Sequence, residues 1–549
     1  MRVKVQTIVV VLAGCILRWC VTYHPYSGEG QPPMYGDYEA QRHWQEITLN
    51  LPVEEWYKNS TQNDLQYWGL DYPPLTAYHS NILGRIAHKI NPKYVALHES
   101  RGFESQMHKY FMRLTVLAAD LFIFVPAALY FVFSCVEKPK EPTPSMLYLC
   151  TRPSVLAVIL FYPGLIIIDY GHFQYNCVSL GAFVAAVAAI LGNFHCLGSL
   201  LFVLGLNYKQ MELYHALPCF IYILAVNKFN RTLFCVTCTV IGTFAAVWWP
   251  FIWDQRTFLS VIIRLFPLAR GVFEDKVANF WCTINVVYKL RDTFENLLLA
   301  QICLFSTTIA LLPSSLDMLF RPSKEKFIIS QINSSLAFFL FSYQVHEKSI
   351  LLAAIPVLLY FHKDRFACLW FLLISTFSML PLIIKDQLFL SHCTLTVFFY
   401  ISVTWIWFSE SFFSMDSDKI LNAEEQISKN ISNKKSKLKK QPKDKKSQAT
   451  SKAKKHVGLM SALKNYLSAV IDKETLIIVL FYLSMGSLVV LTFISRFMQP
   501  PKQYPDLFPL LVSVFSCGHF VLFFIYFNYR QFTLRTGQKL KSNVKLKMN

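Results

Sequence analysis

The chain has 549 residues, of which 54% are hydrophobic and only 16% are charged. A soluble protein of this length carries about 25% charged residues, and many windows of this sequence approach the roughly 17 to 25 apolar residues that cross a bilayer. The composition excludes an ordinary soluble protein and predicts an all-α polytopic membrane protein.

The first predicted element is a signal-anchor transmembrane helix over residues 1–24. No clear cleavage pattern follows its basic start, so we expect it to be retained with its N-terminus in the cytosol. It delivers the polar loop of residues 25–107 to the far side of the membrane. The remaining predicted segments are helices over 108–253, a second far-side loop over 254–295, helices over 296–413, a lysine-rich cytosolic loop over 414–472, two helices over 473–530 and a cytosolic basic tail over 531–549. Together they predict about 14 transmembrane helices, among which the spans near 217–227 and 349–361 are short for a roughly 30 Å core.

Positive charge is concentrated near the C-terminus. The lysine-rich loop cannot bury a core and is predicted to be disordered. It is either a solvated loop that sets topology or a site that attracts anionic membrane lipids. No aromatic platform accompanies its lysines to indicate nucleic-acid binding. The ending Lys545-Leu-Lys547-Met-Asn549 is typical of endoplasmic reticulum membrane proteins, or is a generic basic tail. If it is such an address, the far side is the lumen and Asn59-Ser-Thr61 is a well-placed glycosylation site.

Two aspartates stand out in the first polar loop. Asp37 precedes Tyr38–Asn50, whose apolar spacing suits an amphipathic helix lying on the membrane surface. Asp37 is therefore either the cap of this helix or a catalytic carboxylate. Asp71, before Tyr72-Pro73-Pro74, is either a turn residue or part of a site.

Further polar motifs lie at the ends of predicted spans. Ionisable groups there are costly in lipid and usually face a cavity or one another. The second far-side loop adds basic residues, acids and aromatic rings between Arg264 and Trp281. Aromatic faces stack on sugar rings, and arginine or lysine holds phosphate oxygens; a loop with internal ion pairs explains the same composition.

Six motifs occur in a characteristic order along the chain. They are Met34–Thr48, Gln66–His79, Asp169–Asn176, Asn207–His215, Phe273–Asn279 and Gln344–Ile350. In this combination the chain resembles the dolichyl-phosphate-glucose glucosyltransferases of the endoplasmic reticulum, over nearly its whole length except the lysine-rich loop. The likeness is to members that add the first glucose; those that add the second share an Asp-Tyr-Pro-Pro-like element.

The resemblance implies a GT-C type membrane glycosyltransferase. Glucose would move with inversion from dolichyl phosphate glucose to the terminal mannose of Man(9)GlcNAc(2)-PP-dolichol, forming an α-1,3 bond. The implied enzyme uses no cofactor or metal, acts as a monomer, and lies in the endoplasmic reticulum membrane with a lumenal active site and cytosolic termini. The alternatives are the second-glucose enzyme and a multispan lipid or sugar transporter, which the concentration of polar residues in loops disfavours.

The resemblance also assigns roles to residues. Asp37 would be the general base and Asp71 a supporting residue. His346, Lys348 and Arg270 would hold the donor phosphate, where positive charge favours departure. The candidates for sugar or acceptor binding are Glu39, Arg42, His43, Trp44, Trp68, Tyr72, His172, Gln174, Lys209, Glu212, Glu274 and Asp275.

Overall fold

The computed structural model describes residues 2–137, 152–267, 276–405 and 473–534. Every regular element in these ranges is a helix. The lysine-rich loop, the basic tail and the predicted site residues Arg270, Glu274 and Asp275 lie outside the described residues.

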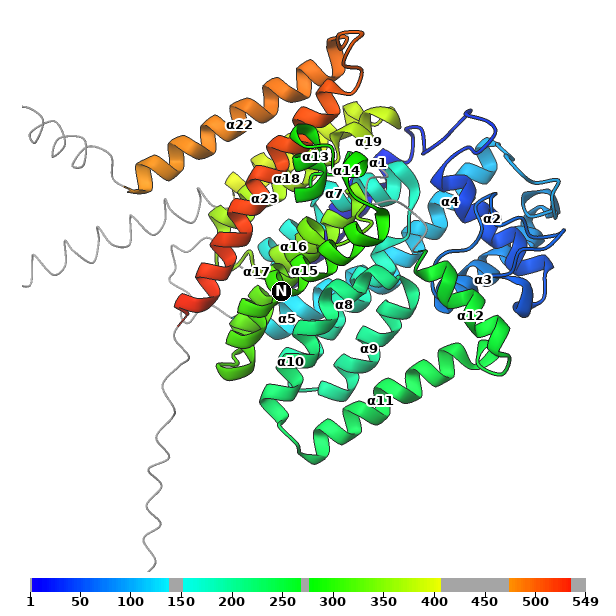
Figure 1. The fold of residues 1–549 in the computed structure, drawn as a ribbon, viewed down its shortest axis with the longest axis horizontal. Coiled ribbons are helices and arrows are strands. Elements are labelled where there is room, and N and C mark those ends of the chain that lie inside the picture. Colours follow the sequence, from blue (N-terminus) through cyan, green and yellow to red (C-terminus); the bar gives the residue numbers. More distant parts are fainter. Residues whose placement is uncertain (1, 138–151, 268–275, 406–472, 535–549) are drawn as a thin grey trace, which may run out of the picture.

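The N-terminal part combines two long helices with a compact polar loop between them. Its elements are α1 (Arg2–Val21), α2 (Asp37–Asn50), η1 (Val53–Glu55), α3 (Pro74–Ile90), η2 (Pro92–Tyr94), α4 (Gln106–Ala119), η3 (Asp120–Phe124) and α5 (Val125–Cys135). The last three form one continuous helix in which η3 is a π-helical turn. In Figure 1, α2 and α3 (blue) gather with α12 at one end of the molecule.

The middle part begins with a broken helix and continues with shorter helices. Its elements are α6 (Arg152–Leu160), α7 (Pro163–Ile166), η4 (Ile167–Phe173), α8 (Asn176–Leu191), α9 (His195–Tyr208), η5 (Gln210–His215), α10 (Ala216–Asn227), α11 (Arg231–Trp248), η6 (Trp249–Phe251) and α12 (Gln255–Leu265). The chain bends by 42° between α6 and the helix that runs from Pro163 to Phe173. A proline at the start of a helix lacks the N–H that would continue the preceding one, so this break follows from the sequence.

The C-terminal part supplies the rest of the bundle. Its elements are α13 (Phe280–Val287), α14 (Leu290–Thr293), α15 (Asn296–Phe320), α16 (Lys324–Phe341), η7 (Glu347–Ser349), α17 (Ile350–Tyr360), α18 (Arg365–Ser378), α19 (Leu380–Lys385), a helix over Phe389–Trp405, α22 (Lys473–Phe497) and α23 (Leu507–Thr533). In Figure 1, α22 (orange) lies away from the end that holds α2 and α3.

The structure confirms a multispan helical membrane protein. Within the described ranges, six helices are long and apolar enough to cross a membrane, and a seventh if the bent pair counts as one span. The predicted number of about 14 is not confirmed. Several predicted spans form shorter helices, such as the 12-residue α10 and the 11-residue α17, which at 1.5 Å per residue are shorter than the bilayer core is thick.

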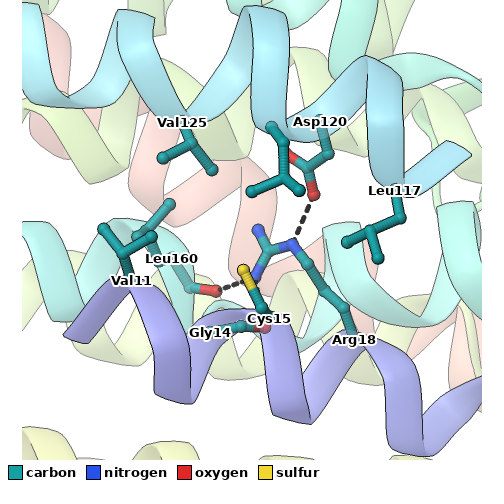
Figure 2. A pocket seen from close by; sticks show the side chains of 9 residues that line it. Val11, Gly14, Cys15, Arg18, Leu117, Asp120, Val125 and Leu160 are labelled. Atoms are coloured by element: carbon teal, nitrogen blue, oxygen red, sulfur yellow. Dashed lines mark hydrogen bonds and ion pairs between the residues drawn. The ribbon is translucent and has the colours of Figure 1, made fainter. Parts of the chain in front are cut away.

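A buried ion pair fixes α1 to the long helix that contains η3 (Figure 2). Arg18 donates through Nε to Asp120 and through Nη1 to the carbonyl of Leu160 at 2.6 Å. Tyr170 donates to the same Asp120 carboxylate at 2.9 Å. Both charged side chains are only 2% exposed, and charges within apolar spans persist where they are paired in this way.

Helix α2 forms where the sequence predicted it, but its predicted position on the membrane surface is wrong. Eleven of its 14 residues, on every face, are buried. On one side α3 approaches so closely that a Cβ at Gly84 would lie 2.7 Å from the carbonyl oxygen of Gln45. The polar residues of α2 pair with one another in the interior. The amphipathic spacing in the sequence therefore reflects buried polar pairs rather than a face exposed to water.

Other helices of the two polar loops carry the exposed apolar faces. On α3, Ile82, Ile86 and Ile90 recur every fourth residue and are each more than 40% exposed. On α12, Leu259 and Ile263 are exposed in the same way. This spacing on an otherwise polar helix is typical of helices at a membrane interface.

Candidate active site

Asp37 is the first residue of α2 rather than its cap. The cap position belongs to Gly36, which has φ 106° and provides no side-chain bond to the helix. A Cβ at Gly36 would lie 2.7 Å from the carbonyl oxygen of Ser27, so both the backbone angle and the space require glycine. The Asp37 carboxylate is therefore available for contacts outside its own helix.

Two donors and the ring of His172, all from distant parts of the chain, converge on Oδ2 of Asp37. Lys348 Nζ, from η7, donates to it at 2.6 Å, and Gln174 Nε2 does so at 2.6 Å. His172 Nε2, from η4, lies 3.0 Å away. The Asp37 side chain keeps 25% of its surface exposed and that of Lys348 keeps 18%, so the ion pair is partly open to an incoming molecule.

The surroundings keep Asp37 ionised. Burial by itself raises the pKa of this carboxyl, but its charged surroundings, first of all the Lys348 ammonium, outweigh burial and hold the pKa well below its usual range. An ionised carboxylate is the protonation state that a general base requires.

His172 lies near Asp37 through Nε2 and contacts Asp386 through Nδ1. Asp386 was not predicted as a site residue from the sequence. Asp386 follows α19, is 3% exposed, and contacts Nδ1 of His172 through Oδ2. A Cβ at Gly171 would lie 2.6 Å from Leu388, so the missing side chain lets the segment after α19 approach η4. The available signal was the polar run Lys385-Asp386-Gln387 between two apolar spans.

A polar network continues from Gln174 away from Asp37. Gln174 Oε1 accepts from Asn176 Nδ2 at 3.0 Å and from Lys209 Nζ at 3.3 Å. Lys209 Nζ also donates to Asn176 Oδ1 at 2.6 Å, and Asn176 Nδ2 donates to Asp169 at 2.8 Å. The motifs Asp169–Asn176 and Asn207–His215 are thus joined to the Asp37 site through hydrogen bonds.

The second aspartate motif borders the same region. The Lys209 ammonium lies 5.2 Å from the ring centroid of Tyr72, and Gln210 Nε2 donates to the backbone carbonyl of Asp71 at 2.9 Å. The pKa of Tyr72 is raised well above its usual value, first by burial and then by the negative charges of Asp71 and Asp37. Pro73 rather than Asp71 precedes α3 as its cap, so Asp71 does not cap that helix.

Two tryptophans, Trp44 and Trp68, lie beside the Asp71 motif. Trp44 Nε1 donates to the carbonyl of Trp68 at 2.9 Å. The rings of Trp44 and Tyr72 have centroids 5.0 Å apart. Trp44 is buried and Trp68 is half-buried, so Trp68 has the more accessible ring face.

The polar residues in the middle of α2 make a buried ion-pair network. Arg42 donates to Glu39 at 2.6 Å and to Glu46 at 2.7 Å, and His43 Nδ1 lies 3.1 Å from Glu46. Tyr67 donates to Glu39 at 2.8 Å. These groups are at most 2% exposed on α2. Sugar binding by Glu39, Arg42 and His43 stays a prediction, and their contacts in this structure hold the first loop together.

The remaining candidates lie around this centre. Glu212 is buried, with its Oε2 2.7 Å from His215 Nδ1. His346 is half-buried and immediately precedes η7, the short helix that carries Lys348. Gln344 donates to the carbonyl of Pro267 at 2.9 Å, which brings the His346 loop beside the end of the segment that carries α12. In the described part of the chain, no cluster of His, Cys, Asp and Glu is arranged to hold a metal ion.

These features define a class of protein. It is a multispan helical membrane protein in which an ionised carboxylate, paired with a lysine and backed by a histidine, lies at the end of the bundle where the first polar loop meets it. The chain belongs to the ALG6, ALG8 glycosyltransferase family, whose model matches residues 14–526.

Similar proteins carry one common description, dolichyl pyrophosphate Man9GlcNAc2 alpha-1,3-glucosyltransferase. The protein of that name from Rattus norvegicus is 45% identical over 528 residues, covering 95% of each chain. Its Mus musculus counterpart is 46% identical over 528 residues with the same coverage, and that of Gallus gallus is 43% identical over 532 residues, covering 96% of each chain.

Proposed function

We propose that this protein transfers glucose from dolichyl phosphate glucose to the terminal mannose of Man(9)GlcNAc(2)-PP-dolichol, with inversion and formation of an α-1,3 bond, in the assembly of the N-glycan precursor. Similarity over 95% of the chain to proteins described as Man9GlcNAc2 alpha-1,3-glucosyltransferases supports the acceptor and the linkage. The observation that supports the mechanism is the Asp37–Lys348 pair, which places a base next to a cation at 2.6 Å.

Single displacement needs one base and a stabilised leaving group. Asp37 removes the proton of the acceptor hydroxyl while that oxygen attacks the anomeric carbon of glucose. The bond to the phosphate breaks with its electron pair on the phosphate oxygen, and Lys348 with His346 stabilises the charge that develops there. Dolichyl phosphate leaves as a stable anion, so a second carboxylate acting as an acid, as in glycoside hydrolysis, is not required.

The contact between Lys348 and Asp37 links donor binding to base strength. The lysine ammonium pairs with the ionised Asp37 carboxylate and lowers its pKa. A donor phosphate competes for the same ammonium and draws part of its charge away from the carboxylate. Asp37 then becomes a stronger base once the donor is in place.

The cellular setting follows from the same proposal. The protein is a GT-C enzyme with about 14 transmembrane helices, acts as a monomer in the endoplasmic reticulum membrane, and keeps its active site in the lumen and both termini in the cytosol. The cation at the donor phosphate is Lys348, and no metal is needed. The exposed apolar faces of α3 and α12 support a position of both loops at the membrane surface.

The test is a transfer assay with purified full-length protein. Dolichyl phosphate glucose is supplied with either Man(9)GlcNAc(2)-PP-dolichol or the same acceptor already carrying one glucose, with and without EDTA. We expect one hexose to be added to the first acceptor at the same rate in EDTA, in an α-1,3 linkage shown by NMR. Transfer only to the glucosylated acceptor would indicate the second-glucose reaction, and loss of activity in EDTA would refute metal independence.

A further inference from the structure

The orientation of the His172 ring follows from its two neighbours. The carboxylate of Asp386 can only accept a hydrogen bond when ionised, so its contact with Nδ1 requires a proton on that nitrogen. Lys348 can only donate, and its ammonium lies 3.0 Å from Nε2. A neutral His172 therefore carries its proton on Nδ1 and presents a bare Nε2 beside Asp37, since the bond made by one ring nitrogen sets the state of the other.

The charges around His172 come from several elements. Asp37 of α2 and Lys348 of η7 face Nε2, and Asp386 after α19 faces Nδ1. On the α4 side, Arg113 donates to the carbonyl of Gly171 at 3.0 Å. From α1, Arg18 is directed to Asp120 instead. The group that contacts Nδ1 directly is Asp386, and it is as deeply buried as the histidine itself.

We propose that Asp386 is a positioning residue for glucosyl transfer: it holds the His172 proton on Nδ1, which keeps Nε2 unprotonated and able to take over from Asp37 the proton that the acceptor hydroxyl gives up. This inference rests on the function proposed above. It assigns a role to a side chain that lies outside the first loop and far from Asp37 in the sequence.

The proton balance is complete. The acceptor O–H proton passes to Asp37 Oδ2 as the new C–O bond forms and the glucosyl–phosphate bond breaks, with the electron pair leaving on the phosphate. The proton then moves across the 3.0 Å contact from Asp37 to Nε2 of His172. The resulting imidazolium lies between two carboxylates, Asp37 and Asp386, and is stabilised by both. Water takes the proton when the products leave, which restores the starting state.

The first test compares Asp386→Asn with a neighbouring control in the full-length enzyme. Lys385→Gln is the control because Lys385 is exposed one position away. We expect D386N to lower kcat about 10²-fold, to change the KM for dolichyl phosphate glucose by less than about 3-fold, and K385Q to behave as the unchanged protein. A D386N enzyme with a kcat within about 3-fold of the unchanged protein would overturn the proposal.

A double-variant cycle separates a shared pathway from two independent effects. If Asp386 acts through His172, the double variant of H172Q with D386N loses no more activity than H172Q alone. Losses that multiply would overturn the proposal. The fraction of folded enzyme, measured by donor binding, is compared for each variant so that a folding defect is not read as a catalytic one.

The pH profile distinguishes positioning from a merely structural role. His172 must be neutral to accept the proton, so kcat falls as acid protonates it. Without the Asp386 charge the imidazolium is less stable, and the acid limb of kcat moves to lower pH while the plateau falls. A lower plateau with an unmoved limb would indicate a structural role and overturn the proposal.

NMR of the unchanged protein tests the protonation of His172 without substrates. It remains informative if D386N does not fold or if no transfer reaction is detected. In the unchanged protein labelled with ¹⁵N-histidine, the His172 signal is assigned by its absence from H172Q. We expect it to show a protonated Nδ1 and a bare Nε2 at neutral pH. The opposite neutral tautomer would overturn the positioning role whatever the reaction is, whereas failure of transfer with this tautomer present would refute the proposed function alone.

Discussion

Replacing Asp37 by asparagine removes the base while keeping the size of the side chain. The two donors and the His172 ring that now surround Oδ2 would meet a neutral amide, and the Lys348 ammonium would lose its ionic partner. Loss of a general base lowers the rate about 10²- to 10⁴-fold, so we expect D37N to lose at least 10²-fold in kcat. Donor binding should persist, because the lysine is then free for the phosphate.

A longer carboxylate tests geometry apart from charge. Asp37→Glu adds one methylene and moves the carboxylate by about 1.5 Å, and a misplacement of about 1 Å costs on the order of 10²-fold in rate. D37E should therefore be nearly as inactive as D37N, although its charge is intact. Nearly full activity in D37E would mean that the lysine counterion, rather than proton transfer, is what the site requires.

The assay measures glucose transferred to the nine-mannose acceptor by purified full-length protein at saturating donor. Asp64→Asn is the matched control, since Asp64 lies exposed in the same loop and its carboxylate accepts a bond from the backbone N–H of Gln66 at 2.9 Å, which an asparagine side-chain oxygen can also accept. Thermal unfolding and donor affinity are measured on every variant. Turnover by D37N within about 10-fold of the unchanged enzyme would refute the assignment of Asp37 as the base.

Three further predictions test the donor site, the fold and the first loop. Lys348→Ala should weaken donor affinity as well as kcat, as measured by donor titration; unchanged donor affinity would remove Lys348 from the phosphate site. Arg18→Met should destabilise the protein by about 3–5 kcal/mol by leaving Asp120 buried and unpaired, and adding Asp120→Asn should restore much of the loss in thermal unfolding. Burial raises the pKa of Glu46, but His43 and then Arg42 outweigh it and lower that pKa to about 2. Its stabilising effect is therefore complete above about pH 4.3 and is lost as the pH falls toward about 2; hydrogen exchange of α2 should rise over that range, and Glu46→Gln should remove this dependence.

The membrane class and the positions of most helices could be predicted from the sequence. Apolar length is a local property, so the predicted segments over 473–530 correspond closely to α22 and α23. The family motifs singled out Asp37, His172, Gln174 and Lys348, which the structure brings together, although their roles remain predictions. The spacing of apolar residues in α2 gave the wrong environment, because periodicity shows that a helix has two faces and not what covers them.

The membrane character, the polar first loop and the family can all be recognised from local patterns in the sequence. Which side chains meet depends on tertiary packing. Asp37, His172, Lys348 and Asp386 come from four separate segments, and the packing of η4, η7 and the turn after α19 around the start of α2 brings them within hydrogen-bonding distance. Contacts of such long sequence separation depend on the packing of the whole bundle, and for that reason the contact of Asp386 with His172 could be recognised only in the folded protein.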